Sequence, residues 1–320
     1  MASPGEASKG KPTVGFVGVG NMGWPMAAQL VADGYTVEVA DGRREVADNF
    51  TQQVGGRSAD SLGQLAAASD LVVTMLPTSA IVSAVLDEVL PQLRPGAIVI
   101  DMSSGEPNAT KALAARVAEA GGHMIDAPVS GGVPRARIGD LAIMVGGDPA
   151  AIAQARPVLE AMGSSLTETG AIGSAHAMKA LNNLVSAGGF LIAVEALLAG
   201  SRFGLDPALM VDVLNASTGM NNSTQKKLKQ FVLSRRFDSG FGLDLLVKDL
   251  GIALGVARDT GTPVPFSSLC RELALAAQAM VGPGRDHTEL AIVSERLAGR
   301  ELPGASLRHS HNRLAAVTWL

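Results

Sequence analysis

Short apolar strands alternate with helical stretches through the first half of this chain. The expected strands span 14–19, 37–40, 71–76, 97–100, 124–127 and 141–145, and helical patterns separate them, as in 22–32 after the first strand. Parallel neighbours in a sheet must be joined by a crossover of a dozen or more residues, which helices of this length supply. The alternation therefore predicts an α/β domain built on a parallel, doubly wound sheet.

The pattern of hydrophobic residues changes after about Gly170, where the strand patterns stop. The segment 172–203 is rich in Ala, Leu and Asn and contains no proline, so it predicts one long helix in spite of its adjacent glycines at 188 and 189. Helical patterns follow at 207–215, 224–234, 243–259, 267–280 and 288–297. We therefore expect a first domain over 12–171 and an all-α second domain over 172–300, joined by the long interdomain helix, with loose tails at 1–11 and 301–320.

The composition limits what can fill the core and which partners fit. Hydrophobic residues make up 47% of the 320 residues but aromatic residues only 3%, so Ala, Val, Leu, Ile and Met must fill the interior. The formal net charge is -4, and no basic stripe is interleaved with aromatic residues, which argues against nucleic acid as a partner. No uninterrupted apolar run approaches the ~18 residues that span a bilayer, so no membrane association is expected.

The single cysteine and the first residues of the chain indicate in which cellular compartment the protein is expected. Cys270 cannot form an internal disulfide and lies in an apolar run, which favours a packed hydrophobic side chain over a nucleophile. The segment 1–11 is small and polar with no apolar stretch, so it is interpreted as a flexible leader and not as a signal peptide. We expect a cytoplasmic protein, and no residue pattern indicates a metal site.

A glycine-rich sequence, G-V-G-N-M-G, joins the first strand to the first helix. The residues expected to contact a ligand there are Gly18, Gly20, Asn21, Met22 and Gly23. The first glycine permits a tight turn, the second lets a pyrophosphate approach the backbone, and the third allows close packing of helix on strand. The N-terminus of the helix presents free N–H groups and the positive end of its dipole to phosphates. This context predicts a dinucleotide-binding site.

The end of the second strand bears on the choice of cofactor. Asp41 lies 18 residues after Gly23, where a carboxylate can accept hydrogen bonds from both ribose hydroxyls of NAD. Arg43 and Arg44 follow at once, and either can receive the 2′-phosphate of NADP or remain an ordinary surface charge. Asp41 and Arg43 are the predicted contacts. We expect NAD, because the carboxylate has the shorter reach to the ribose, while NADP stays possible.

Two later strand ends are expected to line the same crevice, because ligands of open parallel sheets bind at the carboxyl ends of the strands. One end carries Leu76 and Pro77, and the other carries Ser103 and Ser104. Ordinary loop chemistry accounts for such residues equally well. Leu76, Pro77 and Ser104 are the predicted cofactor contacts.

Two features point to a reaction centre. Ser130, Gly131 and Gly132 follow a strand in the sequence D-A-P-V-S-G-G, and a serine with two backbone N–H groups makes a nest for a carboxylate. Lys179 lies in an apolar, alanine-rich helix, with Asn183 four residues on and on the same face. Burying an unpaired ammonium is costly, so such a lysine has a polar partner, a functional role, or a head group that reaches the surface.

Together with K-D-L at 248–250, these sequences resemble the β-hydroxyacid dehydrogenase family. The resemblance covers roughly 11–299 and rests on four motifs in the family's order. It implies an N-terminal Rossmann domain, a helical C-terminal domain and a long interdomain helix that carries the catalytic lysine.

The resemblance also implies roles for single residues. Lys179 corresponds to the catalytic lysine and Asn183 to the asparagine that supports it. The turn at 130–132 corresponds to the one that holds the carboxylate of a small substrate. Lys248 and Ser104 correspond to residues that contact the cofactor.

The chain departs from the family pattern at two positions. Ala175 stands where a glycine usually precedes the lysine, which stiffens the start of the helix. Arg135 stands where glycine is common and brings a charge near the substrate turn. The resemblance therefore does not identify the acid.

The expected activity is the NAD(P)-dependent interconversion of a small 3-hydroxy acid and its aldehyde or ketone by hydride transfer. An imine reductase on the same scaffold and a catalytically silent dinucleotide-binding module are the alternatives. Lys179 argues against the imine reductase, and the presence of both Lys179 and Asn183 argues against the silent module. The helical half is more apolar than its few helices can bury, notably at 184–198 and 273–280, so we expect a homodimer or a homotetramer.

Overall fold

The computed structural model describes residues 10–303 of the chain, which divides into two compact units. The division falls between Ala180 and Leu181, inside the helix α8 (Ser174–Phe203), whereas the sequence-based boundary at 171 and 172 falls just before that helix. At the ends of the described range, Lys11 forms an ion pair with Asp33, and Leu302 is buried. The rest of the two expected tails, 1–9 and 304–320, lies outside the described residues.

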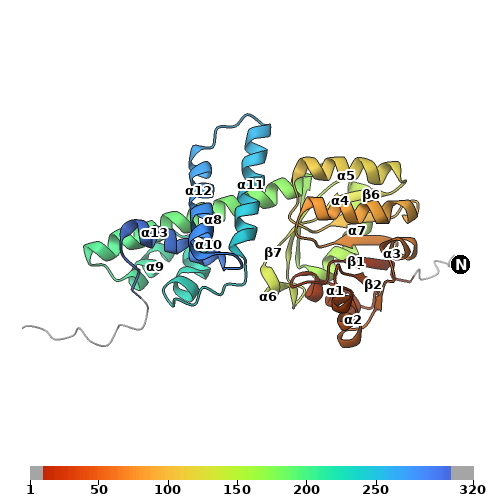
Figure 1. The fold of residues 1–320 in the computed structure, drawn as a ribbon, viewed down its shortest axis with the longest axis horizontal. Helices are drawn as coiled ribbons and strands as arrows, with labels where there is room; N and C mark the ends of the chain where they lie inside the picture. Colours follow the sequence, from red (N-terminus) through yellow and green to blue (C-terminus); the bar gives the residue numbers. More distant parts are fainter. Residues whose placement is uncertain (1–9, 304–320) are drawn as a thin grey trace, which may run out of the picture. The chain divides into compact units, whose positions relative to one another are not determined.

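The first unit is built on one nine-stranded sheet (Figure 1). Its strands are β1 (Thr13–Val17), β2 (Thr36–Ala40), β3 (Arg57–Ser58), β4 (Leu71–Thr74), β5 (Ile98–Asp101), β6 (His123–Asp126), β7 (Val129–Ser130), β8 (Ala142–Gly146) and β9 (Ser165–Gly170). The order is β3-β2-β1-β4-β5-β6-β8-β7, with β9 paired to β8. Because the chain leaves β1 in one direction and returns to β4 on its other side, the carboxyl ends of β1 and β4 frame the crevice where such sheets bind ligands.

The sheet is parallel from β3 to β6, as expected, but not beyond. β8 runs antiparallel to both β6 and β7, and only β9 is parallel to β8. The helix before β8, α6 (Gly132–Ala136), has five residues, which is too short for the crossover that a parallel neighbour requires. The predicted parallel, doubly wound sheet is therefore confirmed from β3 to β6, and the expected strand at 141–145 departs from it by running antiparallel to its neighbours β6 and β7.

Helices cover both faces of the sheet. They are α1 (Gly23–Ala32), α2 (Arg44–Gln53), α3 (Leu62–Ala68), α4 (Ser79–Val89), the single turn η1 (Leu90–Gln92), α5 (Pro107–Glu119) and α7 (Pro149–Met162). Residues of α1, α2 and α7 pack with Phe16 and Val73 on one face, and residues of α3, α4 and α5 pack with Val17 and Val72 on the other (Figure 1). Neighbouring residues of one strand thus enter opposite cores, which explains why the strands are apolar throughout.

The second unit is helical. Beyond α8 it contains α9 (Pro207–Asn215), α10 (Asn222–Lys226), the π-helical turn η2 (Leu228–Val232), α11 (Leu243–Asp259), α12 (Pro265–Val281), the single turn η3 (His287–Glu289) and α13 (Leu290–Ala298). Among its described residues, the only β-pairing is an isolated bridge between Gly242 and Asp286. The core holds Phe190 and Leu250 with alanines of α12, and Cys270 is buried there as the sequence predicts.

One expected helix of this unit is divided. The sequence pattern predicts a continuous helix over 224–234, but the segment consists of α10 and then η2, with Lys227 between them. The Asn221 side chain accepts hydrogen bonds from the backbone N–H groups of Ser223 and Thr224, which starts α10 earlier than the pattern indicates. The prediction of one α-helix is therefore wrong at Lys227.

Helix α8 contains no uninterrupted apolar run of ~18 residues, but among the described residues it is one helix long and apolar enough on average to cross a membrane. By length and composition it meets that description, because a helix can carry a single glutamate and still be apolar on average. Half of its most apolar 18-residue stretch is buried inside the structure. Burial of this kind is common in core helices of proteins without membrane spans, so the length of α8 is weak evidence for membrane insertion.

Candidate active site

The glycine loop between β1 and α1 has three distinct local environments. Gly18 has φ +97°, and a Cβ atom there would lie 2.3 Å from the carbonyl oxygen of Met75. A Cβ atom on Gly23 would lie 1.8 Å from the carbonyl oxygen of Gly18, so this position allows α1 to pack against the strand. At Gly20 the same atom would meet nothing within 4 Å. The loop is therefore tight at both ends and open at its centre.

The N-terminus of α1 faces this opening without a side-chain cap. Its N-cap residue, Met22, makes no side-chain hydrogen bond, and no acidic residue lies in the first turn. The first N–H groups of a helix need acceptors, and a phosphate supplies them together with a favourable charge for the helix dipole. The open space at Gly20 and the uncapped helix thus fit the pyrophosphate of a dinucleotide.

Asp41, directly after β2, is fastened to the glycine loop. Its Oδ2 atom accepts a hydrogen bond from the backbone N–H of Val19 at 3.0 Å, and its Oδ1 atom accepts one from the backbone N–H of Arg43 at 3.1 Å. Each carboxylate oxygen can accept more than one hydrogen bond, so contact with a ribose is still available. Asp41 therefore shapes the loop in addition to its predicted role.

The two arginines after Asp41 have different surroundings. The guanidinium of Arg44 contacts Asp48 at 3.1 Å, Asp60 at 3.3 Å and the carbonyl oxygen of Ala59 at 3.1 Å, so it is held on α2. Arg43 is exposed and lines a pocket of about 510 Å³. Arg43, and not Arg44, is the cation placed to meet a ligand.

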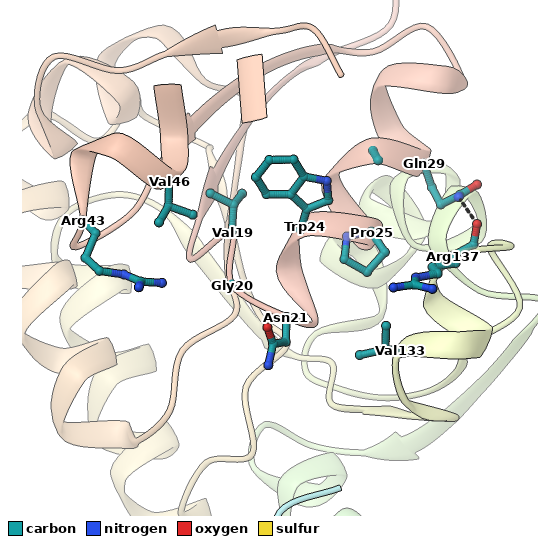
Figure 2. A pocket seen from close by; sticks show the side chains of 11 residues that line it. Val19, Gly20, Asn21, Trp24, Pro25, Gln29, Arg43, Val46, Val133 and Arg137 are labelled. Carbon is teal, nitrogen blue, oxygen red and sulfur yellow. Dashed lines mark hydrogen bonds between the residues drawn. The ribbon is translucent and has the colours of Figure 1, made fainter. Parts of the chain in front are cut away.

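This pocket begins at the glycine loop. Its walls are Val19, Gly20, Asn21, Trp24, Pro25, Ala28, Gln29, Arg43, Val46, Val133 and Arg137. Figure 2 shows Arg43 on one side, Val133 and Arg137 on the other, and Asn21 between them. Three predicted cofactor contacts line this pocket: Gly20, Asn21 and Arg43. Val133 and Arg137, which lie more than a hundred positions after Asn21 in the chain, line it as well.

The other predicted cofactor contacts lie at the ends of β4 and β5. The hydroxyl oxygen of Ser103 accepts a hydrogen bond from the backbone N–H of Leu76 at 2.9 Å, which joins the two strand ends. Ser103 is fully buried, whereas Ser104 is half-buried and Pro77 is exposed. The structure therefore gives Ser103 an architectural role and leaves Ser104 the more accessible of the two serines.

The turn at Ser130 contains two glycines with positive φ angles. Gly131 has φ +130° and Gly132 has φ +65°, values that side-chain-bearing residues rarely adopt. The charge of Arg135 is met by Asp140, whose Oδ2 atom lies 2.9 Å from its Nε atom. Hydrogen bonding to Arg135 is the main cause that holds the pKa of Asp140 below its usual range. Arg135 is thus half of an ion pair beside the turn.

The start of α8, which carries Lys179, is tied to the carboxyl end of β6 by a buried carboxylate. Asp126 accepts hydrogen bonds from the backbone N–H groups of Gly173 and His176, both at 2.8 Å. Its carboxylate therefore satisfies two of the N–H groups that a helix start leaves without partners. Burial is the main cause that raises the pKa of Asp126, against the hydrogen bonds and the His176 imidazole, which lower it.

The His176 side chain extends this connection to β5 and α5. Its Nδ1 atom lies 2.7 Å from the Thr110 hydroxyl, and its Nε2 atom lies 3.9 Å from Oδ2 of Asp101. A Cβ atom on Gly105 would come within 2.7 Å of the imidazole, so the loop after β5 packs directly on the ring. Lys179 follows His176 by less than one helical turn, in the same compact unit as the glycine loop and the turn at Ser130.

In the second unit, the expected residues Asn183 and Lys248 meet at a buried carboxylate. Asn183 donates from Nδ2 to Oδ2 of Asp249 at 2.6 Å, and Lys248 places its ammonium 3.5 Å from Oδ1. Asp249 is 2% exposed. It therefore fixes which way the Asn183 amide points.

Sequence reasoning overlooked three of these residues: Asp126, His176 as a helix anchor, and Asp249. Each carboxylate ends or interrupts an apolar pattern, which is a local signal for a buried charge. Their partners are 47 to 66 positions away in the chain. Only the fold brings them together.

Comparison with known proteins identifies the family of both parts of the chain. Residues 13–172 match the family model of the NAD binding domain of 6-phosphogluconate dehydrogenase. Residues 173–294 match the family model described as the NAD-binding domain of NADP-dependent 3-hydroxyisobutyrate dehydrogenase. The two matches together account for nearly all described residues.

Individual relatives cover the chain almost completely. The 2-(hydroxymethyl)glutarate dehydrogenase of Eubacterium barkeri is 35% identical over 91% of this chain and 97% of its own length. The structure of Mycobacterium tuberculosis 3-hydroxyisobutyrate dehydrogenase with L-serine matches 89% of this chain and 99% of its own, with 32% identity and a TM-score of 0.82. Psf3 in complex with NADP+ and 2-OPP matches 88% of this chain and 99% of its own, with 31% identity and a TM-score of 0.76.

These matches extend through the glycine loop, the turn at Ser130 and the helix that carries Lys179. The chain belongs to the β-hydroxyacid dehydrogenase family and is an NAD(P)-dependent hydroxy-acid oxidoreductase.

Proposed function

We propose that this enzyme interconverts a small 3-hydroxy acid and its aldehyde or ketone, with Lys179 as the group that exchanges the proton. The observation that carries the proposal is the fastening of α8: Asp126 and His176 fix the helix start less than one turn before Lys179. A catalytic side chain on a fixed helix is held in one geometry throughout the reaction. The relatives named above, which act on small hydroxy acids by their names, support the substrate class.

In the proposed mechanism the substrate carboxylate binds at Ser130, Gly131 and Gly132. The serine hydroxyl and the two backbone N–H groups supply the donors that a carboxylate needs. When bound, the nicotinamide ring accepts the hydride in oxidation or supplies it in reduction. Leu76, Pro77 and Ser104 at the strand ends, with Lys248, are the proposed further contacts of the cofactor.

Lys179 acts on the oxygen of the reacting carbon. In oxidation its neutral amine accepts the hydroxyl proton at Nζ, and in reduction its ammonium returns that proton while it stabilises the developing oxyanion. Asn183 follows one turn later on α8 and orients the oxygen through its amide, which Asp249 holds. In this proposal Lys179 exchanges the proton, and Asn183 positions the oxygen of the reacting carbon.

We infer a preference for NAD over NADP. Asp41 lies at the end of β2, where its negative charge disfavours a 2′-phosphate, and Arg44 is occupied by Asp48 and Asp60. Arg43 is the competing influence, because it is exposed beside the glycine loop. A kcat/KM with NADP that exceeds the value with NAD by tenfold, about 1.4 kcal/mol, contradicts this preference.

We also propose that the enzyme works as a cytoplasmic homodimer or homotetramer. Large apolar side chains of the helical unit are exposed in the single chain, among them Val185, Phe203 and Leu209. Apolar area of this kind stabilises association at ~25 cal/mol per Å² buried. The single cysteine, Cys270, is buried and has no second cysteine in the chain to pair with, so the fold does not depend on an oxidising compartment. Light scattering that shows a monomer at micromolar concentration contradicts the oligomer.

The test of the central proposal is Lys179→Ala, assayed with 3-hydroxyisobutyrate and both cofactors. We expect kcat to fall by ~10² to 10⁴, with little change in the Kd of NADH measured by fluorescence. Lys179→Arg should restore little of the lost kcat, because a guanidinium stays protonated. Asn183→Ala should lower kcat less than Lys179→Ala does. The matched control is Lys226→Ala, an exposed lysine on α10. A Lys179→Ala variant that keeps kcat within about threefold excludes the proposed role.

A further inference from the structure

The pocket beside the glycine loop has one wall that lies apart from the predicted cofactor contacts. Arg43 stands on one side of the pocket, Val133 and Arg137 stand on the other, and Asn21 lies between them (Figure 2). Val133 belongs to α6, the short helix that follows the turn at Ser130, and Arg137 is the C-cap residue of that helix. Neither residue comes from the glycine loop or from the end of a parallel strand, where contacts to a dinucleotide are usually found.

The two arginines of this pocket differ from the other arginines of the first unit. Among residues 10–303, Arg43 and Arg137 form hydrogen bonds through their backbone atoms alone, and neither guanidinium contacts a carboxylate. Each of the other arginines between residues 10 and 180 does contact a carboxylate side chain: Arg44, Arg57, Arg94, Arg116, Arg135 and Arg156. The walls of the pocket include no acidic residue. The pocket is therefore electropositive, which favours a ligand with negative charge.

Arg137 is held at its wall by its backbone. Its carbonyl oxygen accepts a hydrogen bond from Nε2 of Gln29 on α1 at 2.8 Å, and its N–H donates to the carbonyl oxygen of Val133 at 3.0 Å. A Cβ atom on Gly139 would lie 3.3 Å from Oε1 of Gln29, so the chain after α6 packs on the same side chain. The backbone of Arg137 is thus fixed against α1, while its exposed side chain lines the pocket.

We propose that Arg137 binds the pyrophosphate of the dinucleotide cofactor, from the side of the pocket opposite Arg43. The proposal rests on the cofactor of the family and is independent of which acid the enzyme uses. Gly20 and Asn21, at the open centre of the glycine loop, line the same pocket. Both phosphates of the pyrophosphate are negative, whereas a helix N-terminus supplies only about half a positive charge. A guanidinium adds a full charge and a fork of N–H donors that fits phosphate oxygens.

The position of Arg137 favours the pyrophosphate over the 2′-phosphate of NADP. The adenine ribose, which carries the 2′-phosphate, binds at the end of the second strand, where Asp41 and Arg43 follow β2. Figure 2 shows Asn21 between Arg43 and Arg137. Arg137 therefore lies at the end of the pocket away from the ribose, and its contact is common to NAD and NADP.

The experiment measures cofactor binding without turnover. The Kd values of NADH and NADPH are determined by fluorescence, and that of ADP-ribose, which keeps the pyrophosphate and lacks the nicotinamide, by calorimetry. For Arg137→Met we expect all three Kd values to rise by ~10-fold, the usual order for one contact to a charged group. The Kd of the wild type should also rise more steeply with salt than that of the variant, because salt screens the lost charge. Arg137→Lys should restore part of the affinity, because it keeps the charge without the fork.

A matched variant and the choice of ligands separate the outcomes. Arg94→Met removes another exposed arginine, which contacts Asp70 at the amino ends of the strands, and should leave every Kd within about threefold of the wild type. A Kd of NADH that is equally unchanged in Arg137→Met overturns the proposal. A loss confined to NADPH also overturns it, because Arg137 then contacts the 2′-phosphate. Weakened binding of NADH and ADP-ribose in an enzyme that oxidises no 3-hydroxy acid supports the role of Arg137 and rejects the proposed function.

Discussion

The two compact units each bury one histidine almost completely, and the two rings differ in their electrostatic surroundings. His176 in the first unit lies near two carboxylates, at 3.9 Å from Asp101 and 4.0 Å from Asp126. His287 in the second unit lies near the rings of Phe190 and Phe241. Its Nδ1 atom lies 3.5 Å from a carboxylate oxygen of Asp286, but burial and the Lys227 ammonium outweigh that carboxylate in their effect on the pKa of the ring. In both rings the Nε2 atom has no hydrogen-bond partner among the described residues.

The difference shows that burial alone does not determine what a histidine does. The ring of His176 connects segments, since its contacts join β5, α5 and the start of α8. The ring of His287 is kept neutral, because burial and a nearby cation both disfavour its protonation. We therefore expect substitutions around His176 to act mainly on stability, and substitutions of His287 to act on its dependence on pH.

The largest expected effect follows from removing the carboxylate beneath His176. Asp126→Ala leaves the N–H groups of Gly173 and His176 buried without an acceptor, so we expect the free energy of unfolding to fall by about 4 kcal/mol. Urea denaturation at pH 7 measures this loss. Asp87→Ala, which breaks an exposed ion pair with Arg116, is the control and should cost less than about 1 kcal/mol. Similar losses in the two variants mean that Asp126 does not anchor α8.

The second prediction concerns His287 and pH. Its pKa is about 4 in the folded chain, against 6.5 for an ordinary solvated imidazole, so as the pH falls the unfolded chain binds this proton first. The stabilising contribution is complete above pH 6.5 and is lost between pH 6.5 and 4, with a total of roughly 3 kcal/mol. Urea denaturation across that range should show a shallower decline for His287→Gln than for the wild type. His123→Gln changes an exposed histidine and should keep the wild-type slope.

A slope for His287→Gln equal to that of the wild type removes the contrast between the two rings. In that case His287 titrates equally in the folded and unfolded chains, and burial has not displaced its pKa.

The smallest expected effect is the coupling between His176 and Thr110. A double-mutant cycle with His176→Leu and Thr110→Val should give an interaction free energy of about 1 kcal/mol, the ordinary value for one hydrogen bond. The reference cycle pairs Thr110→Val with His287→Leu, and these two changes should add, because they affect different units. An interaction near zero in the first cycle means that the 2.7 Å contact contributes no stability.

Local patterns predict much of the fold. The expected helices at 207–215 and 243–259 coincide with α9 and α11, because in each a continuous apolar face begins and ends at a clear boundary. The strand β9 escapes prediction, since it lies at the edge of the sheet and most of its residues are exposed, which leaves no apolar pattern. The break at Lys227 escapes prediction because η2 is a single π-helical turn of five residues, too short to show a hydrophobic period of its own.

The candidate site also has a part that local sequence patterns predict and a part that they do not. The glycine loop is predictable because its residues are neighbours in the chain and each has its own steric reason. The anchors of α8 are not, because the hydrogen bonds from the helix start to Asp126 and from Asn183 to Asp249 join distant segments. Lys179 is singled out mainly by resemblance, since a lysine in an apolar helix often reaches the surface. Its catalytic role stays a prediction.

The double attachment of Asp41 has a consequence for anyone who redesigns the enzyme to use the other nicotinamide cofactor. The obvious substitution, Asp41→Ser or Asp41→Ala, is meant to remove a repulsive charge. It also removes the acceptor of the hydrogen bonds from the backbone N–H groups of Val19 and Arg43, so we expect the glycine loop and the turn after β2 to lose order when the charge is removed. A substitution at Asp41 therefore cannot change the charge near the cofactor site without also changing the hydrogen bonds that hold the glycine loop. Arg43 and the exposed Gly42 beside it can be varied with far less interference.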